Sequence, residues 1–121
     1  MLAKLKFLSV FGLLMLGLVS SASAATCTIY YSGTVYGSTP VNTTTEAVAP
    51  FTVNCDGAYS GSLTNLSSAW LTLQLEKLVN GAWTVVSSGY ISYSGTAGTY
   101  RYTVRNSGNG NGSWSVTYRH P

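Results

Sequence analysis

The segment Leu71-Thr-Leu-Gln-Leu-Glu-Lys-Leu-Val-Asn-Gly-Ala-Trp83 joins a strand pattern to a turn pattern. Its first three leucines alternate with polar residues, so they share one face of an extended strand, whereas a helix would need them three or four residues apart. Asn80-Gly81 is typical of a two-residue hairpin turn, because both residues tolerate positive φ. The segment therefore predicts two antiparallel strands joined at Asn80-Gly81.

The same period of two recurs on both sides of this hairpin. The residues expected on inward faces are Cys27, Ile29, Tyr31, Gly33 and Val35, then Phe51, Val53 and Cys55, then Tyr100, Tyr102 and Val104, and finally Trp114, Val116 and Tyr118. Seven or eight short strands, with a turn signal about every 8 to 12 residues, predict an all-β fold. We expect one antiparallel β-sandwich of the jelly-roll or immunoglobulin-like type over residues 25–121.

Residues 1–24 have the three parts of a signal peptide. Lys4 and Lys6 precede an apolar run over residues 7–19, and Ala22-Ser-Ala24 fits a cleavage site. The apolar run is shorter than the roughly 20 residues of a membrane-spanning helix, which disfavours an uncleaved anchor. We expect cleavage at about Ala24/Ala25, no membrane association afterwards, and a secreted or periplasmic mature protein.

Cys27 and Cys55 are the only cysteines of the sequence. Two cysteines in an exported chain most simply form one disulfide, and both fall on inward faces of predicted strands. A metal site is the alternative, but structural zinc takes four ligands and the sequence offers one histidine beside the two cysteines. We therefore expect a Cys27–Cys55 disulfide and no metal.

The charge of the mature chain is small. Without Lys4 and Lys6, four basic residues stand against three acidic ones, which gives a net charge of +1. A nucleic-acid-binding surface needs several cations to neutralise phosphates, so we expect no nucleic-acid partner. Because 7% of all residues are charged and 12% are aromatic, an expanded disordered chain is excluded.

Residues suited to catalysis are scarce. His120 is the only histidine, and its place beside the last residue of the sequence predicts a solvated, mobile side chain. Glu46, Asp56 and Glu76 are expected in a loop, a turn and an outward strand position, so they predict neither a carboxylate pair nor a calcium site. We expect no enzymatic activity and no cofactor.

Aromatic side chains are better candidates for a ligand surface. Tyr30 and Tyr36 fall on the outward face of the first predicted strand, and exposed rings stack on sugars or peptide side chains. The alternative is that they are ordinary half-buried strand tyrosines. Trp70, Trp83 and Trp114 are expected mainly in the core, and Trp70, which interrupts the leucine alternation, is the best surface anchor of the three.

The last two predicted strands flank Asn106-Ser-Gly-Asn-Gly-Asn-Gly112, a composition that predicts a flexible loop. If these strands pair across the loop, Arg101 lies opposite Arg119, and Arg105 joins them in a small basic stripe. Solvated arginines, with Glu76 as a partner, are the alternative. The complete candidate ligand surface is Tyr30, Tyr36, Trp70, Arg101, Arg105 and Arg119.

Several short motifs punctuate the second half of the chain. They are Phe51-Thr-Val53, Gly61-Ser-Leu63, Trp83-Thr-Val-Val86, Gly95-Thr-Ala-Gly-Thr-Tyr-Arg-Tyr-Thr-Val104 and Gly110-Asn-Gly-Ser-Trp-Ser-Val-Thr-Tyr118. With these motifs, residues 49–118 resemble the bacterial pre-peptidase C-terminal domain, a small β-sandwich module found beside secreted proteases. The resemblance implies a secreted β-sandwich module that stands alone here, without the protease.

These patterns favour a secreted, non-catalytic binding module for an extracellular polymer, protein or cell-surface glycan. One alternative is a structural or assembly subunit of an extracellular fibre or surface layer, although only Ala25 and Thr26 precede Cys27 as a donor segment for strand addition. The other is a secreted protease inhibitor, suggested by the resemblance. It would need a rigid exposed loop, which residues 106–112 are not expected to provide.

Overall fold

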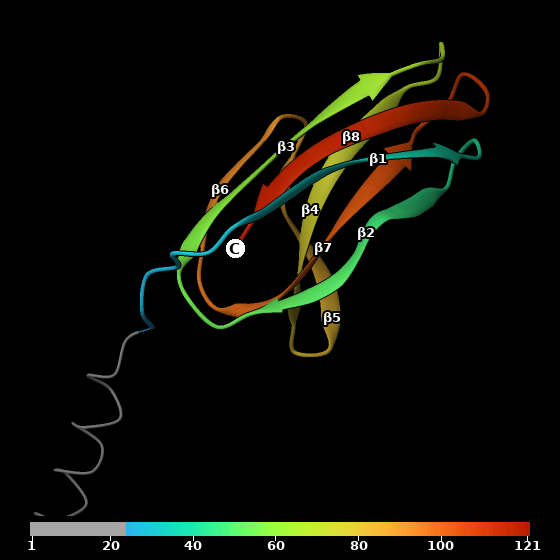
Figure 1. The fold of residues 1–121 in the computed structure, drawn as a ribbon. Coiled ribbons are helices and arrows are strands. Elements are labelled where there is room, and N and C mark those ends of the chain that lie inside the picture. The colour runs from blue at the N-terminus through green and yellow to red at the C-terminus, as the bar shows by residue number, and fades with distance from the viewer. Residues whose placement is uncertain (1–23) are drawn as a thin grey trace, which may run out of the picture.

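Two four-stranded antiparallel sheets packed face to face make up the structure, a computed structural model that describes residues 24–121 (Figure 1). The strands are β1 (Tyr31–Thr39), β2 (Thr44–Val53), β3 (Gly57–Asn65), β4 (Leu71–Val79), β5 (Ala82–Ser88), β6 (Ile91–Gly95), β7 (Gly98–Asn106) and β8 (Gly112–His120). Among the described residues, no helix is long and apolar enough to cross a membrane. The predicted signal peptide over residues 1–24 lies outside them, apart from Ala24.

The strand order is β1-β8-β3-β6 in one sheet and β2-β7-β4-β5 in the other. Only β4 and β5 are neighbours both in sequence and in a sheet, and every other connection passes from one sheet to the other. In Figure 1, for example, the chain leaves β1 in the front layer and enters β2 in the layer behind. This is the order of a jelly roll, in which two Greek keys form a sandwich. The predicted fold class, an antiparallel sandwich with one disulfide, is confirmed.

The β4–β5 hairpin forms where the leucine alternation and the turn residues predict it. Leu73 and Leu75 are fully buried, and Asn80 and Gly81 have φ of 51° and 79°. The expected core position of Trp83, however, is wrong. Alternation along β5 turns Val86 toward the core and leaves the Trp83 ring half-buried on the outer face of the sheet.

The core between the sheets consists largely of aromatic rings that lie over glycines. Trp114, which is 2% exposed, leans across its register partner Gly37, where a Cβ atom would come within 2.6 Å of the indole. Tyr118 crosses Gly33 in the same way, at 2.8 Å. The fully buried hydrophobic side chains are Tyr59, Leu73, Leu75, Ile91, Tyr100, Tyr102, Val104 and Val116. The expected core position of Trp114 is thus confirmed.

The predicted pairing of the last two strands is wrong. β7 pairs with β2 and β4, and β8 pairs with β1 and β3, so the two strands lie in different sheets. Their inward side chains meet across the core, where the ring centroids of Tyr102 and Tyr118 are 5.8 Å apart. Period-two alternation fits side-by-side and face-to-face strands equally well, so it did not distinguish them.

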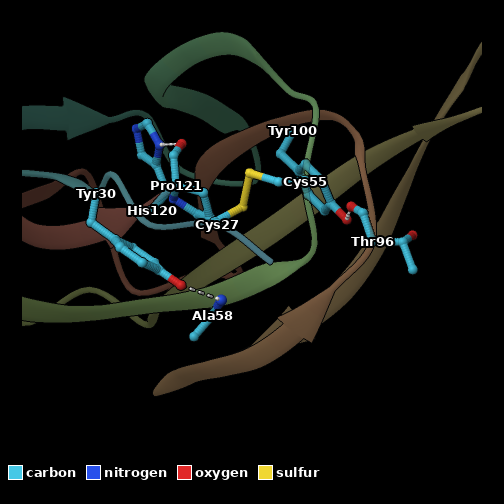
Figure 2. The surroundings of a disulfide bond; sticks show 8 residues. All are labelled: Cys27, Tyr30, Cys55, Ala58, Thr96, Tyr100, His120 and Pro121. Carbon is cyan, nitrogen blue, oxygen red and sulfur yellow. Dashed lines mark hydrogen bonds between the residues drawn. A yellow bond between two sulfur atoms is a disulfide. The ribbon is translucent and has the colours of Figure 1, made fainter. Parts of the chain in front are cut away.

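The Cys27–Cys55 disulfide closes one end of the sandwich (Figure 2). It joins the segment before β1 to the segment after β2, with Cα atoms 5.1 Å apart. The Cys27 N–H donates to Asp56 O, and the Asp56 N–H donates to Ala25 O, both at 2.8 Å. The predicted disulfide is confirmed, and it indicates folding in an oxidising compartment.

The inward assignment of two residues near the disulfide is wrong. Ile29 and Tyr31 are 68% and 61% exposed. Ile29 precedes β1 and Tyr31 is its first residue, so both lie at the margin of the sheet, ahead of the inward-facing Gly33 and Val35.

His120 is buried, contrary to the solvated position that its place in the sequence predicted. It is 8% exposed, its ring stacks on Phe51 with a centroid separation of 3.7 Å, and its Nδ1 lies 2.8 Å from Pro121 O (Figure 2). Burial lowers the pKa of the imidazole below its ordinary value of 6.5. The β1–β8 register continues to the Tyr31–His120 pair, and sheet pairing therefore orders this residue.

Three connections hydrogen-bond to one another at the opposite end of the sandwich, which we call the loop end: residues 40–43, 66–70 and 107–111. Asn106 is fully buried, and its Nδ2 donates to Thr39 O at 3.0 Å and to Gly110 O at 2.8 Å. Asn109 Nδ2 donates to Ser68 O at 2.6 Å. Residues 106–112 are thus held by their neighbours rather than flexible as expected, because the asparagine amides find backbone partners that the composition does not reveal.

Candidate functional site

Hydroxyl side chains cover the outer face of the β1-β8-β3-β6 sheet. Alternation points every second residue of each strand away from the core. We call these outward residues the hydroxyl face: Ser32, Thr34, Tyr36 and Ser38 of β1, Ser113, Ser115, Thr117 and Arg119 of β8, Ala58, Ser60, Ser62 and Thr64 of β3, and Ser92 and Ser94 of β6. All are Ser or Thr except Tyr36, Ala58 and Arg119.

The strand register aligns these side chains in rows across the sheet. One row is Ser32, Arg119, Ser60 and Ser92, and the next is Thr34, Thr117 and Ser62. The Oγ1 atoms of Thr34 and Thr117 lie 3.2 Å apart and share a hydrogen bond. Because neighbouring strands are about 4.8 Å apart and outward residues recur about every 7 Å, the face is a regular grid of groups that both donate and accept hydrogen bonds.

A buried tyrosine from the other sheet fixes the backbone of this grid. The Tyr102 hydroxyl of β7 donates to Ser60 O at 2.9 Å and lies 3.1 Å from Arg119 O. Burial keeps the pKa of Tyr102 above its ordinary value, so the hydroxyl keeps its proton and remains a donor. The strand segments that carry Ser60 and Arg119 are therefore tied to the core.

Tyr90 stands at the edge of the grid and is 77% exposed. Together with Ser62 it lines two hollows, one of about 270 Å³ that extends to Thr117 and Arg119, and one of about 240 Å³ that extends to Leu71. Gly89, with φ of 81°, turns the chain from β5 toward β6 just before this ring. Sequence patterning missed Tyr90, although a tyrosine directly after a turn glycine was the available signal.

Three of the six candidate surface residues lie on or beside the hydroxyl face. Tyr36 is 76% exposed, as expected. Tyr30 is only half-exposed, because its hydroxyl accepts the Ala58 N–H at 3.2 Å, as Figure 2 shows. The guanidinium carbon of Arg119 lies 4.1 Å from the centre of the Tyr30 ring. Tyr30 and Arg119, which the sequence did not link, thus form one stacked pair.

Arg101 and Arg105 lie on the other sheet, where both point outward from β7. The predicted basic stripe with Arg119 is therefore wrong, because its formation required β7 and β8 to pair. The two outer faces of the sandwich separate these arginines from Arg119.

Arg101 is the centre of an ion cluster. Its Nη1 lies 3.3 Å from Glu46 and its Nη2 lies 3.2 Å from Glu76, while its guanidinium carbon lies 4.3 Å from the Trp83 ring centre. The expected loop position of Glu46 is wrong, because it belongs to β2. Glu46 and Glu76 both pair with Arg101, and the sequence did not predict that these two carboxylates share a partner. Residues 24–121 contain no group of three His, Cys, Asp or Glu side chains that could hold a metal ion.

Trp70 lies at the loop end rather than on the hydroxyl face. It is 63% exposed, its backbone N–H donates to Gly108 O at 3.0 Å, and a Cβ atom on Gly108 would come within 3.2 Å of its ring. Leu66 and Val41, at 59% and 41% exposure, belong to the same end. Trp70 is exposed as a surface anchor should be, but it lies on the connection between β3 and β4, outside the sheet face that carries Tyr36 and Arg119.

Comparisons with known proteins identify a fold rather than a family. A scan against protein-family models found no match, and a search of the curated proteins found none either. Among solved structures, the chain is similar to the Yersinia pseudotuberculosis-derived mitogen, with a TM-score of 0.57 and 18% identity, covering 74% of this chain and 86% of that one. It also matches PirA, with a TM-score of 0.42 and 20% identity, covering 76% of this chain and 94% of that one. The likeness to the mitogen shows a shared β-sandwich fold, and the resemblance to the pre-peptidase C-terminal domain stays a prediction.

Proposed function

We propose that residues 25–121 are an exported, non-catalytic binding module that holds an extracellular glycan on its hydroxyl face. The observation that carries the proposal is the grid of serine and threonine hydroxyls, bordered by the exposed rings of Tyr36 and Tyr90. Sugar hydroxyls both donate and accept hydrogen bonds, as the grid does, and aromatic rings cover the apolar faces of sugars.

Several features disfavour other partners for this face. A protein interface has an apolar core, whereas the centre of the hydroxyl face is polar in every row. A nucleic acid would meet one cation, Arg119, which neutralises too little phosphate. The disulfide supports an oxidising compartment such as the periplasm or the cell exterior, where structural glycans are exposed, and the expected signal peptide agrees with it.

The loop end supports a second candidate function, the binding of a protein partner. Trp70, Leu66 and Val41 are exposed there on connections that hydrogen-bond to each other, and exposed apolar side chains on a rigid support are typical of protein contacts. Binding of a protein at the loop end should depend on Trp70, whereas glycan binding should depend on Tyr36 and Tyr90. Variants of these three residues therefore separate the two functions.

The test is retention on polysaccharides of the protein produced with its disulfide formed. Soluble polymers are tested by affinity electrophoresis, and cellulose, chitin and peptidoglycan by sedimentation. We expect retention on at least one glycan and a loss of about tenfold in affinity when Tyr36→Ala and Tyr90→Ala are combined, since each ring contributes about 0.7 kcal/mol.

Trp70→Ala is the matched control, because it removes another exposed ring outside the hydroxyl face. It should leave glycan affinity unchanged. Failure of every glycan to retain the wild-type protein, or an equal loss from the control, would exclude the hydroxyl face as the binding surface.

A further inference from the structure

Arg119 is the only charged side chain of the hydroxyl face. Within residues 24–121 both ion pairs belong to Arg101, and the Arg119 guanidinium neither joins an ion pair nor donates a hydrogen bond to these residues. Asp56 and Tyr30 line a separate hollow, and Asp56 makes no ion pair with Arg119. The charge of Arg119 is therefore not matched by a carboxylate of the described residues.

The two stacked arginines of the domain, Arg101 and Arg119, differ in whether a carboxylate neutralises their charge. Arg101 stacks on Trp83 and satisfies its charge with two carboxylates, whereas Arg119 stacks on Tyr30 and faces hydroxyls. The edge of a guanidinium plane pairs with a carboxylate through two parallel hydrogen bonds, and among the described residues no carboxylate pairs with Arg119 in this way.

Neutral hydrogen-bonding groups lie around Arg119. Ser32 and Ser60 are the register partners of Arg119 on its two sides, and the hollow of about 270 Å³ that it lines also includes Ser62, Thr117 and Tyr90. The hollow therefore combines one fixed cation, several hydroxyls and one ring at its border.

We propose that this hollow binds an acidic sugar, with its carboxylate on Arg119 and its ring hydroxyls on the neighbouring serines and Thr117. The inference rests on the proposed glycan-binding function and adds the class of saccharide. Stacking on Tyr30 restricts the arginine before the ligand arrives, so less side-chain entropy is lost on binding than at an ordinary exposed arginine.

The test compares polygalacturonate with the same polymer after reduction of its carboxyl groups, which keeps the backbone and removes the charge. We expect the wild-type protein to bind the acidic polymer about tenfold more tightly, with a preference that shrinks in 0.5 M salt, roughly as screening requires. Arg119→Gln should abolish the preference, and Arg119→Lys, which keeps the charge but loses the planar fork, should retain part of it.

Arg105→Gln is the matched control, because it removes the same charge from the opposite sheet. It should leave the preference unchanged, and unfolding midpoints of all variants confirm that they fold. Equal wild-type affinity for both polymers, or a preference that survives Arg119→Gln or is lost in Arg105→Gln, overturns the acidic-sugar site and leaves the glycan-binding proposal standing. Binding to neither polymer, together with no retention on the neutral panel, overturns both.

Discussion

At the scale of single residues, burial of His120 makes the stability of the domain depend on pH. Its ring lies between Phe51 and Tyr118, where water cannot solvate a charged imidazole. The folded pKa is lowered below the ordinary value of 6.5, so the unfolded chain binds a proton at pH values where the folded domain does not. The stabilising effect is complete above about pH 6.5 and is lost as the pH falls toward the folded pKa.

We therefore expect the free energy of unfolding, measured in urea, to fall when the pH is lowered from 7.5 to 5.5. His120→Gln removes the ring that stacks on Phe51, so the free energy of unfolding of the variant should be lower at pH 7.5. Because it also removes the titrating group, this free energy should change less between pH 7.5 and 5.5. An equal pH slope in the two proteins would assign the dependence to other groups.

The exposure of single side chains and the contacts of the two stacked arginines differ in how far the sequence predicts them. Tyr36 could be predicted as exposed, because strand alternation places it outward. The expected core position of Trp70 is wrong, and its interruption of the leucine alternation was the one signal of its exposure. The contacts of Arg101 with Glu46 and of Arg119 with Tyr30 could not be predicted, since each joins residues that are far apart in sequence. Only the sheet order decides which of these side chains meet.

At the scale of elements, Asn106 joins β7 to the loop end. Its amide nitrogen donates to Thr39 O and Gly110 O, and its Oδ1 accepts the Gly108 N–H at 3.0 Å. Asn106→Ala leaves these three backbone groups without their partner, of which Thr39 O lies in the buried interior and the Gly108 and Gly110 groups are part-buried. We expect a loss of about 2–3 kcal/mol in the free energy of unfolding, measured by chemical denaturation.

Asn111→Ala is the control within the same loop. Its Oδ1 accepts the Val41 N–H at 3.1 Å in an exposed position, where water replaces the lost bond. We expect a loss below about 0.5 kcal/mol. Similar losses for the two variants would mean that burial of the Asn106 amide does not hold the loop end together.

Strand content and strand order differ in how far the sequence determines them. Alternation and the Asn80-Gly81 turn are local signals. They predicted the β4–β5 hairpin and strands that overlap β1, β2, β7 and β8, but they did not single out β3 or β6. Six of the seven connections instead cross between sheets, so neighbours in a sheet come from distant segments. The β7–β8 pairing failed for this reason, and the separation of Arg101 from Arg119 followed from it. The hydroxyl face was not predicted, because β8 supplies only Ser113, Ser115 and Thr117 of its hydroxyls and the others come from three other strands.

At the scale of the whole molecule, the disulfide and the central rows of the hydroxyl face belong to different elements. Cys27–Cys55 joins the segments flanking β1 and β2 at one end of the sandwich, whereas β8 and β3 carry the central rows of the hydroxyl face. The bridge spans 28 residues, and in the chain-entropy account it stabilises the domain by about 3 kcal/mol through restriction of the unfolded chain.

Replacement of both cysteines, Cys27→Ala with Cys55→Ala, should therefore lower the free energy of unfolding by about 3 kcal/mol and leave glycan affinity unchanged at temperatures where the variant is folded. Denaturation of the variant, and of the wild-type protein with and without reductant, gives the first quantity, and affinity electrophoresis gives the second. The reduced wild-type protein should match the variant within about 1 kcal/mol, because both lack the same cross-link. Loss of affinity in a fully folded variant would show instead that the disulfide end positions the face, through the Tyr30 ring that supports Arg119.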